Sequence, residues 1–441
     1  MSRIRCEGRD VDLSYSTNVH PAETFDELLA MLRRDVALVS RGAFGETEAC
    51  VNLRLGMTQV DELLGHPMLP STSTLSDGIL AAPPTPRCAE LLATLKASKL
   101  RVVSINGFPI RAFHAPRVKE QVYSPPWTDG GRVIYTLKIA KAFAHLLDDR
   151  REGAVSVPSG TFKGYTDSDE IKAQCAHFLT ECVRELARLE RLTGKTVRLG
   201  LEPEPYTTGE AVDEFIEYYT RFILPAAKDK LPLQMRLSAA EVEKLVRRFI
   251  TVNLDLCHQA VEFEDPIEDL KKLRAAGIAV TGLHLSAALK LPDPATNAAA
   301  FEQLMALDEP RYLHQVVARK RDGALARFED LPDLKNPRRL KGLSLGDIAE
   351  LRCHFHVPLF ADFPGPLAST RDTVAPAARF AVREGLTDNL VVETYTWNVL
   401  NELASSGVAS AQSIVGAGGV DVNAGLVREL QWALQGLQGA A

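Results

Sequence analysis

The most constraining feature of this chain is an alternation of short apolar segments with longer segments of helical periodicity. The apolar segments predict strands at residues 11–20, 49–56, 101–109, 153–158, 196–202, 250–257, 279–285 and 389–395. Helical periodicity lies between them, as at 88–96, 131–148 and 168–193. Such a strand–helix repeat favours parallel strands, because each helix then crosses over the sheet from one strand to the next.

Eight units of this kind predict an α/β fold, the (β/α)8 TIM barrel, with long loop insertions. The competing fold is an open doubly wound sheet, which usually carries a Gly-x-Gly-x-x-Gly turn after its first strand, and this chain has none. We therefore predict one barrel domain over residues 1–441. The segment 287–370 is too long for an ordinary crossover between the seventh and eighth strands, so we expect it to form part of the active-site face. Within it, 312–321 and 351–360 are further extended candidates.

Composition narrows the function classes. The chain is 46% hydrophobic and 24% charged, which is typical of a globular protein. No apolar stretch reaches the ~20 residues of a membrane helix, and residues 1–10 carry no export signal, so we expect no membrane insertion and a cytoplasmic location. A net charge of −6 argues against a nucleic-acid partner. The expected partners are a small molecule and, as a homo-oligomer, a second copy of the chain.

Strand parity sorts the side chains of the predicted barrel into an outer and an inner face. Alternate residues of a strand point to opposite faces, so the aliphatic positions of the fifth to eighth strands pack outward against helices. The inward positions at the ends of these strands are then Glu202, Asp255, His284 and Glu393. The active sites of barrel enzymes lie at this carboxyl-terminal end.

These four residues predict a metal site. Crowded, unpaired acids would repel one another and would be costly to desolvate, and a divalent cation removes both penalties. An oxygen-rich set with one imidazole suits Zn or Mn best, with Co or Mg as alternatives. Taken singly, each acid has a simpler interpretation as the partner of an Arg or Lys, and the histidine as a core residue bonded to backbone.

Three more histidines are candidate metal ligands. His258 follows Asp255 by three residues, and His354 and His356 share a strand face. They predict either a second ion or side chains that orient the first ion's ligands, with stacked loop histidines as the alternative.

The candidate substrate contacts follow the predicted strands. Lys119, Arg117 or Arg319 would suit a phosphate group, although exposed basic side chains are usually only solvated. Trp397 would suit the floor of a sugar pocket. The full set of predicted substrate contacts is His20, Asn106, His114, Lys119, Glu204 and Trp397.

The motifs around these residues resemble those of the xylose-isomerase-like barrel superfamily, which includes sugar phosphate isomerases, epimerases and, more distantly, endonuclease IV. The matching motifs are Leu-Glu202-Pro, Leu-Asp255-Leu-Cys-His258, Leu-His284-Leu-Ser, His354-Phe-His356-Val-Pro-Leu and Val-Glu393-Thr. The chain resembles the metabolite-traffic proteins called EboE more closely, through Thr-Asn18-Val-His20, Ile-Asn106-Gly-Phe-Pro, Leu-Glu202-Pro-Glu204-Pro, Pro310-Arg-Tyr-Leu-His314-Gln and Val-Glu393-Thr-Tyr-Thr-Trp397.

The superfamily resemblance implies that Glu202, Asp255, His284 and Glu393 bind one cation. It also implies that the two glutamates exchange protons with the carbon beside a carbonyl group. The nuclease pattern implies a further zinc site at His258 with an Asp and a His of one short segment. Here that segment has His354 in place of the Asp, which puts the nuclease metal arrangement in doubt.

Three functional hypotheses follow. The first is a metal-dependent isomerase or epimerase of a sugar, sugar phosphate or cyclitol-like metabolite, with Glu202 and Glu393 as base and acid around an enediolate stabilised by the cation. The second is a zinc-dependent phosphoester hydrolase with a multinuclear site. The third, suggested by EboE, is a non-enzymatic carrier or partner protein of a metabolite-export assembly. One tight ion per chain would favour proton transfer, whereas two or three would favour hydrolysis.

Overall fold

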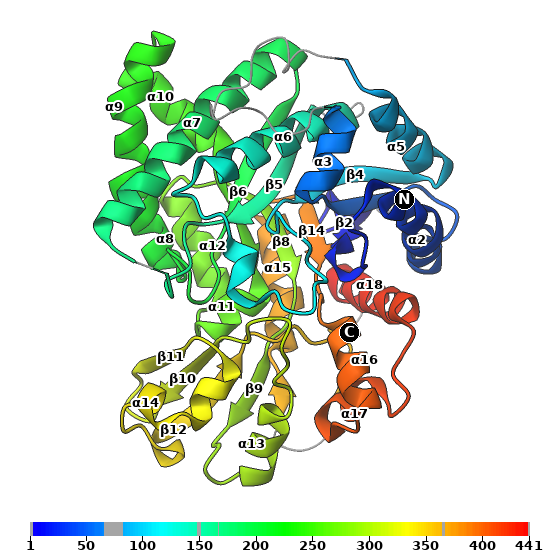
Figure 1. Cartoon of the computed structure of the whole chain (residues 1–441), viewed down its shortest axis with the longest axis vertical. Coiled ribbons are helices and arrows are strands. Elements are labelled where there is room, and N and C mark those ends of the chain that lie inside the picture. Colours follow the sequence, from blue (N-terminus) through cyan, green and yellow to red (C-terminus); the bar gives the residue numbers. More distant parts are fainter. Residues whose placement is uncertain (1–2, 66–82, 148–150, 166, 364–366, 440–441) are drawn as a thin grey trace.

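Eight parallel strands form the centre of the molecule in the computed structural model, which describes residues 3–65, 83–147, 151–165, 167–363 and 367–439 (Figure 1). The strands are β2 (Arg9–Tyr15), β3 (Ala49–Arg54), β4 (Leu100–Asn106), β5 (Glu152–Pro158), β6 (Thr196–Glu202), β7 (Ile250–Asp255), β8 (Val280–Leu285) and β14 (Asn389–Val392). Each falls within one residue or two of the start of a predicted strand.

The central sheet closes on itself. Its order is β1-β2-β14-β8-β7-β6-β5-β4-β3. In this order β2 and β3 stand at the two ends of the run of parallel strands. A parallel bridge between Ser16 and Asn52 joins their carboxyl-terminal ends. The predicted (β/α)8 barrel with long insertions is therefore confirmed. The sequence did not indicate β1 (Arg3–Cys6), which pairs antiparallel with β2 outside the barrel.

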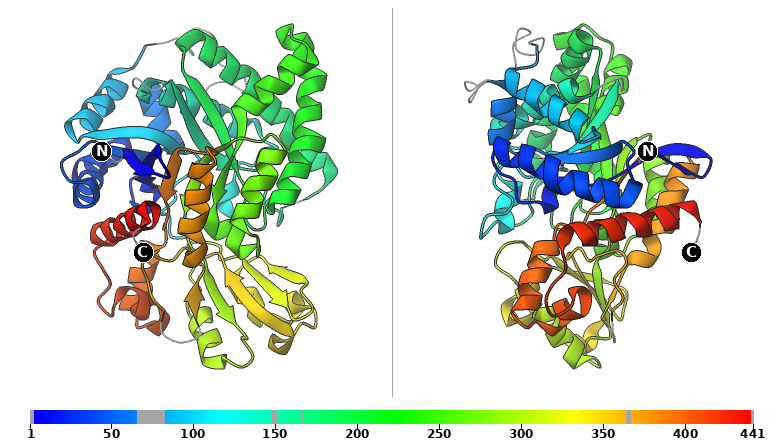
Figure 2. Two further views of the ribbon diagram at one scale, coloured as in Figure 1. Left: turned by 180° about the vertical axis from the view of Figure 1, so that it is seen from behind. Right: turned by 90° about the vertical axis from the view of Figure 1, so that its right-hand side faces the viewer.

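Helices surround the barrel in the order in which they follow the strands (Figures 1 and 2). They are α1 (Phe25–Met31), α2 (Ala37–Phe44), α3 (Met57–Leu64), α5 (Pro86–Ala97), α6 (Gly130–Leu146), α7 (Asp169–Thr193), α8 (Val212–Tyr218), α9 (Leu224–Met235), α10 (Ala239–Phe249), α11 (Leu256–Val261), α12 (Pro266–Ala275) and α15 (Val374–Arg383). Every residue of β3, β7 and β14 is buried, because helices cover one face and the barrel interior covers the other.

Local sequence explains where the helices begin. Asp265 accepts hydrogen bonds from the amides of Ile267 and Glu268, and Pro266 occupies the first position of α12, as its sequence predicts. Ser168 caps α7 through the amide of Ile171. Residues of the described chain form no helix that is both long enough and apolar enough to cross a membrane.

The long segment between β8 and β14 forms a second, antiparallel sheet beside the barrel mouth (Figure 1). Its order is β11-β10-β12-β9-β13. The strands are β9 (Leu289–Pro292), β10 (Val316–Lys320), β11 (Leu325–Phe328), β12 (Ile348–Cys353) and β13 (Ala368–Ser369), with α13 (Ala298–Met305) and α14 (Pro337–Leu340) between them. The extended candidates at 312–321 and 351–360 coincide in part with β10 and β12.

Three further helices follow β14 within the described residues, and the sequence analysis did not predict them. They are α16 (Trp397–Ser405), α17 (Ala409–Val415) and α18 (Val422–Gln438). Figure 2 shows α18 lying alongside the N-terminal α2, and α18 also contacts α15. The C-terminal helices thus close the barrel wall next to β14.

Candidate metal centre

The four predicted ligands come together at the carboxyl-terminal mouth of the barrel. Glu202 and Asp255 end β6 and β7, His284 lies next to the end of β8, and Glu393 follows β14. These strands are adjacent in the sheet, and Asp255 is paired in register with His284. One ligand atom from each residue lies within 4.8 Å of the other three.

Each carboxylate has one oxygen that is held by neighbouring donors. Oε2 of Glu202 accepts from the hydroxyl of Ser156 and, at 3.1 Å, from the amide of Asn253. Oε1 of Glu393 accepts from the amides of Asn18 at 2.7 Å and Asn106 at 3.2 Å. The second oxygen of each glutamate is left to face the centre of the site.

Asp255 follows the same rule. Its Oδ1 accepts from the hydroxyl of Ser286 at 2.7 Å and from the backbone amides of Cys257 and His258 at 2.8 and 3.1 Å. Its Oδ2 has no hydrogen-bond partner although it is buried. The start of α11 therefore fixes this carboxylate with one oxygen pointing away from its donors.

His284 supplies the fourth atom that faces the centre. Its Nδ1 lies 3.4 Å from Oε1 of Glu202 and 3.4 Å from Oδ2 of Asp255, and it contacts Oε2 of Glu393. This Nδ1 also lacks a hydrogen bond. In the described part of the chain, no Lys or Arg forms an ion pair with any of the three acids, so the simpler interpretation of them as Arg or Lys partners does not hold here.

The electrostatics of this cluster favour a positive charge at its centre. Burial lowers the pKa of His284, but Glu393 and Glu202 raise it more, so that the pKa lies well above 6.5. Three carboxylate oxygens and one imidazole nitrogen, two of them orphaned, form a donor set that a divalent cation fits.

Asn253 supports two of these ligands from within the barrel. Its amide nitrogen lies 3.1 Å from both Oε2 of Glu202 and Nε2 of His284. Two glycines make room for it: a Cβ at Gly282 would collide with Oδ1 of Asn253, and one at Gly200 would lie 3.0 Å from its Cβ. Larger residues at either glycine would displace the amide.

A second cluster, the three-histidine cluster, consists of His258, His354 and His356. Nε2 of His354 lies 3.1 Å from Nε2 of His258 and 3.3 Å from Nε2 of His356. His354 and His356 lie in the loop after β12. The backbone amide of His354 donates to the carbonyl of Gln315, and this contact holds the loop at the barrel mouth. His258 and His354, which are 96 positions apart in sequence, are thus brought together.

The other nitrogen of each ring, Nδ1, lies against an oxygen acceptor of the protein. Nδ1 of His258 faces the carbonyl of Pro203 at 3.1 Å, and Nδ1 of His356 faces the carbonyl of Glu393 at 2.8 Å. Nδ1 of His354 faces Oε1 of Gln315 at 2.7 Å. Because these partners only accept, each Nδ1 carries the hydrogen and each neutral Nε2 presents a lone pair. Three lone pairs that converge need a proton or a cation between them.

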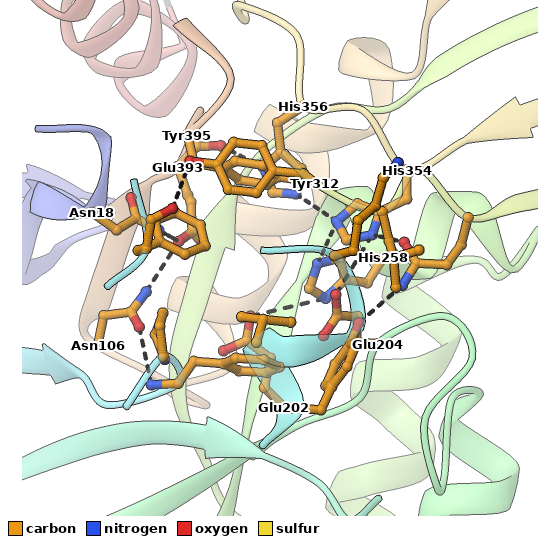
Figure 3. Close-up of a pocket in the computed structure, with 18 residues that line it drawn as sticks. Asn18, Asn106, Glu202, Glu204, His258, Tyr312, His354, His356, Glu393 and Tyr395 are labelled. Atoms are coloured by element: carbon orange, nitrogen blue, oxygen red, sulfur yellow. Dashed lines mark hydrogen bonds and ion pairs between the residues drawn. The ribbon is translucent and has the colours of Figure 1, made fainter. Parts of the chain in front are cut away.

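A cavity is lined by two of the four predicted metal ligands, Glu202 and Glu393, and by all three residues of the three-histidine cluster (Figure 3). Three predicted substrate contacts line it, namely Asn106, Lys119 and Glu204. Burial raises the pKa of Glu204 to about 7, and its Oε2 has no hydrogen-bond partner. Nζ of Lys119 lies 2.7 Å from Oδ2 of Asp330, so its charge is neutralised.

The other three predicted substrate contacts do not line this cavity. His20 hydrogen bonds with the hydroxyl of Tyr15, and Nε2 of His114 lies 2.7 Å from the carbonyl oxygen of Asn18. Trp397 is fully buried and donates from Nε1 to Oε2 of Glu429 at 2.8 Å. These contacts give the three residues packing and supporting roles.

Several cavity residues were not singled out from the sequence as substrate contacts. Asn18 sits in the turn after β2, and Gln315, Tyr312 and Leu313 precede β10 in the second sheet. In the sequence analysis they are named only within the motifs on which the predicted resemblance to EboE rests. The full lining is Asn18, Asn106, Phe108, Pro109, Phe113, Lys119, Val122, Tyr123, Glu202, Glu204, His258, Tyr312, Leu313, Gln315, His354, His356, Glu393 and Tyr395.

Comparison with known proteins gave structural similarity only. No family model and no curated protein matches the sequence. The probable 3-DHS dehydratase AsbF of Bacillus anthracis, involved in petrobactin synthesis, is 12% identical, with 76% of this chain and 90% of AsbF covered at a TM-score of 0.35. The 3-keto-D-glucoside 4-epimerase YcjR of E. coli is 13% identical, with 62% and 78% covered at a TM-score of 0.34. The IolI protein with a bound zinc atom is 11% identical, with 92% and 98% covered at a TM-score of 0.39.

Similarity at this level leaves the activity open, so the function has to follow from the side chains of the chain itself. The resemblance to EboE stays a prediction.

Proposed function

We propose that this protein is a divalent-metal-dependent isomerase or epimerase of a small molecule that carries a hydroxyl group next to a carbonyl group. The observation that carries the proposal is the set of four atoms that face one centre, Glu202 Oε1, Asp255 Oδ2, His284 Nδ1 and Glu393 Oε2. These residues would hold the cation, with Zn or Mn as the best candidates.

A bound cation would supply Lewis acidity, which polarises a carbonyl oxygen and makes the neighbouring C–H more acidic. The chain would supply the proton transfers. Glu202 and Glu393 come from β6 and β14, which β8 and β7 separate, so the two carboxylates flank the centre. One, as a carboxylate, would take the proton from carbon and later release it to solvent. The other, as a carboxylic acid, would give its own proton to the opposite face or to the neighbouring carbon.

The held oxygens give the two glutamates different surroundings. Oε1 of Glu393 receives two amide donors, from Asn18 and Asn106, and all three residues line the cavity. Oε2 of Glu202 receives the hydroxyl of Ser156 and the amide of Asn253, both inside the barrel. Donors of this kind stabilise a carboxylate and fix its position, which general acid–base catalysis requires.

Metal content and isotope exchange test the proposal. We expect the purified chain to bind metal tightly, and Glu202→Gln and Asp255→Asn each to lose at least ten-fold in affinity. Glu217→Gln, an exposed acid on α8, is the matched control and should leave metal binding unchanged. In heavy water, the metal-loaded protein should place deuterium on the carbon next to the carbonyl of its substrate. Unchanged metal content in both site variants would refute the assignment of Glu202 and Asp255 as metal ligands.

A second candidate function has its own observation in its favour. The three-histidine cluster lies beside the first centre, since Nε2 of His258 is 3.9 Å from Oδ1 of Asp255. A second ion there would suit hydrolysis of a phosphoester, in which two ions bind the attacking and leaving oxygens. Two ions per chain together with phosphatase activity and no deuterium exchange would favour hydrolysis over proton transfer.

The resemblance to EboE supports a role in a biosynthetic or metabolite-traffic pathway. The seven cysteines, all free and buried, support a cytoplasmic location. We also propose that residues 1–441 act as one domain, in which 287–370 forms part of the active-site face. The arrival of His354 and His356 at the cavity supports this division.

A further inference from the structure

We propose that the substrate is an uncharged molecule with a hydroxyketone head and an apolar, ring-sized body. This inference rests on the proposed function, because the head is the part that would meet the metal centre. It concerns the rest of the cavity, whose walls decide what else the molecule carries.

Away from the predicted metal ligands, aromatic rings form much of the cavity wall. Phe113, Tyr312 and Tyr395, called here the aromatic trio, have ring centroids 4.9, 5.0 and 5.7 Å apart. The trio adjoins the three-histidine cluster, since the Tyr395 ring lies 4.8 Å from that of His356. Figure 3 shows Tyr312 and Tyr395 beside Glu393 and His356.

More apolar side chains continue this wall. Phe108, Pro109, Val122 and Leu313 line the same cavity. Phe108 and Leu313 belong with Tyr123 to a small hydrophobic cluster that is separate from the barrel core. An apolar body would remove this surface from water, at about 25 cal/mol for each Å² buried.

Most polar groups on this wall are already used by the protein. The hydroxyl of Tyr312 donates to the carbonyl of Phe113 at 3.1 Å. Nε2 of Gln315 donates to the hydroxyl of Tyr123 at 2.9 Å and to the carbonyl of Pro205 at 3.2 Å. A polyol body would need partners for each hydroxyl it buries, and an unpaired buried hydroxyl costs roughly 1–3 kcal/mol.

Two buried polar atoms of the lining have no hydrogen-bond partner. Oδ1 of Asn18 can only accept a hydrogen bond, and Oε2 of Glu204 accepts one when Glu204 is ionised. Asn18 is held beside Glu393 by the hydrogen bond from its own amide. Its Oδ1 is therefore placed to accept from the hydroxyl of the head, close to the metal centre.

Apart from the three-histidine cluster, the charged side chains around the cavity disfavour a phosphate on the body. Lys119 is the one Lys or Arg among the described residues that line the cavity, and Asp330 neutralises it at 2.7 Å. The other cations considered for phosphate pair elsewhere, Arg117 with Glu120 at 3.3 Å and Arg319 with Glu350 at 3.0 Å. A dianion would also meet the carboxyl of Glu204 in a poorly solvated space.

A matched series of three probes tests the proposal. All share the head HOCH2–C(=O)–, and the body is phenyl in 2-hydroxyacetophenone, hydroxymethyl in dihydroxyacetone and phosphorylated in dihydroxyacetone phosphate. Isothermal titration calorimetry on the zinc-loaded full chain measures each Kd. We expect 2-hydroxyacetophenone to bind at least ten-fold more tightly than dihydroxyacetone, and the phosphate to bind no more tightly than dihydroxyacetone.

Variants locate the preference. Phe113→Ala should reduce the ten-fold preference for the phenyl probe to less than three-fold, with zinc content and the affinity for dihydroxyacetone unchanged. Phe222→Ala, an aromatic position outside the cavity, is the control and should keep the preference. The proposal is overturned if the phosphate binds most tightly, if the phenyl probe has no advantage, if no probe binds, or if Phe113→Ala leaves the preference intact.

Deuterium exchange separates this proposal from the proposed function. A preference for the phenyl probe without exchange into any hydroxyketone would uphold the substrate class and refute the isomerase. Exchange into dihydroxyacetone, together with a preference for dihydroxyacetone over the phenyl probe, would uphold the isomerase and refute the substrate class.

Discussion

Nε2 of His258 and Nε2 of His354 lie 3.1 Å apart, while each ring uses its Nδ1 to face a fixed acceptor. Burial lowers the pKa of both rings, but Asp255 and Glu204 raise that of His258 more, so its pKa rises overall. The pKa of His354 stays well below 6.5. A positive charge is therefore favoured between the two rings, and either a shared proton or a cation would supply it.

The first prediction concerns that charge. We expect the zinc-loaded protein to hold two ions per chain and His354→Ala to hold one, because the second ion loses the central ligand of the three-histidine cluster. The second ion alone does not make the protein a hydrolase, since that assignment also requires phosphatase activity without deuterium exchange. Elemental analysis after exhaustive dialysis measures the ratio. His177→Ala, a histidine on α7 away from the cavity, should keep both ions. If the wild type and His354→Ala both held one zinc ion per chain, the positive charge between His258 and His354 would be a shared proton.

The second prediction concerns Gln315 as a positioning residue for His354. Gln315→Leu removes the acceptor that fixes the His354 ring, so the second ion should bind 10- to 100-fold more weakly while the first is unaffected. Chelator competition measures both affinities. Gln315→Glu keeps an acceptor for Nδ1 of His354 and should restore most of the affinity. Equal loss in both variants would point to a general disturbance of the loop instead.

The sequence was most informative about the barrel interior. Strand parity depends only on the alternation of side chains, so it placed Glu202, Asp255, His284 and Glu393 on one rim without any knowledge of the loops. The loops do not follow this rule. Gln315 and Asn18 reach the cavity because the chain folds back from a second sheet and from a short turn, and neither path has a periodic signal.

Trp397 shows the opposite error. It follows Glu393 by four residues and so looked like part of the rim. In the structure α16 begins at Trp397, which turns the indole away from the cavity and toward α18. Its partner, Glu429, lies 32 residues later, in a helix that the sequence analysis did not predict.

The third prediction follows from that contact. Trp397→Phe should lower the free energy of unfolding by roughly 1–3 kcal/mol, because Oε2 of Glu429 would be left buried without a donor. Urea denaturation followed by circular dichroism measures the change. Zinc content and the affinity for 2-hydroxyacetophenone should stay at wild-type values. If the folded variant no longer bound the probe, Trp397 would contact the substrate after all, and the prediction would be wrong.

The fourth prediction concerns the pH dependence that Glu429 contributes. Burial raises the pKa of this carboxyl from 4.5 to about 7, against the lowering effect of donors from Leu359, Thr394 and Trp397. The folded state therefore binds more protons than the unfolded state between these values, and stability falls as pH rises through this window. Ionisation of Glu429 then costs the folded state up to about 3 kcal/mol.

Replacing this carboxyl removes the titration. We expect the unfolding free energy of Glu429→Gln to fall less than that of the wild type between pH 5 and pH 8, by up to about 3 kcal/mol. Urea titrations at several pH values measure the slope. Glu217→Gln changes an exposed acid and should keep the wild-type slope. An identical slope in Glu429→Gln would mean that the carboxylate is already ionised at pH 5, with its three donors outweighing its burial.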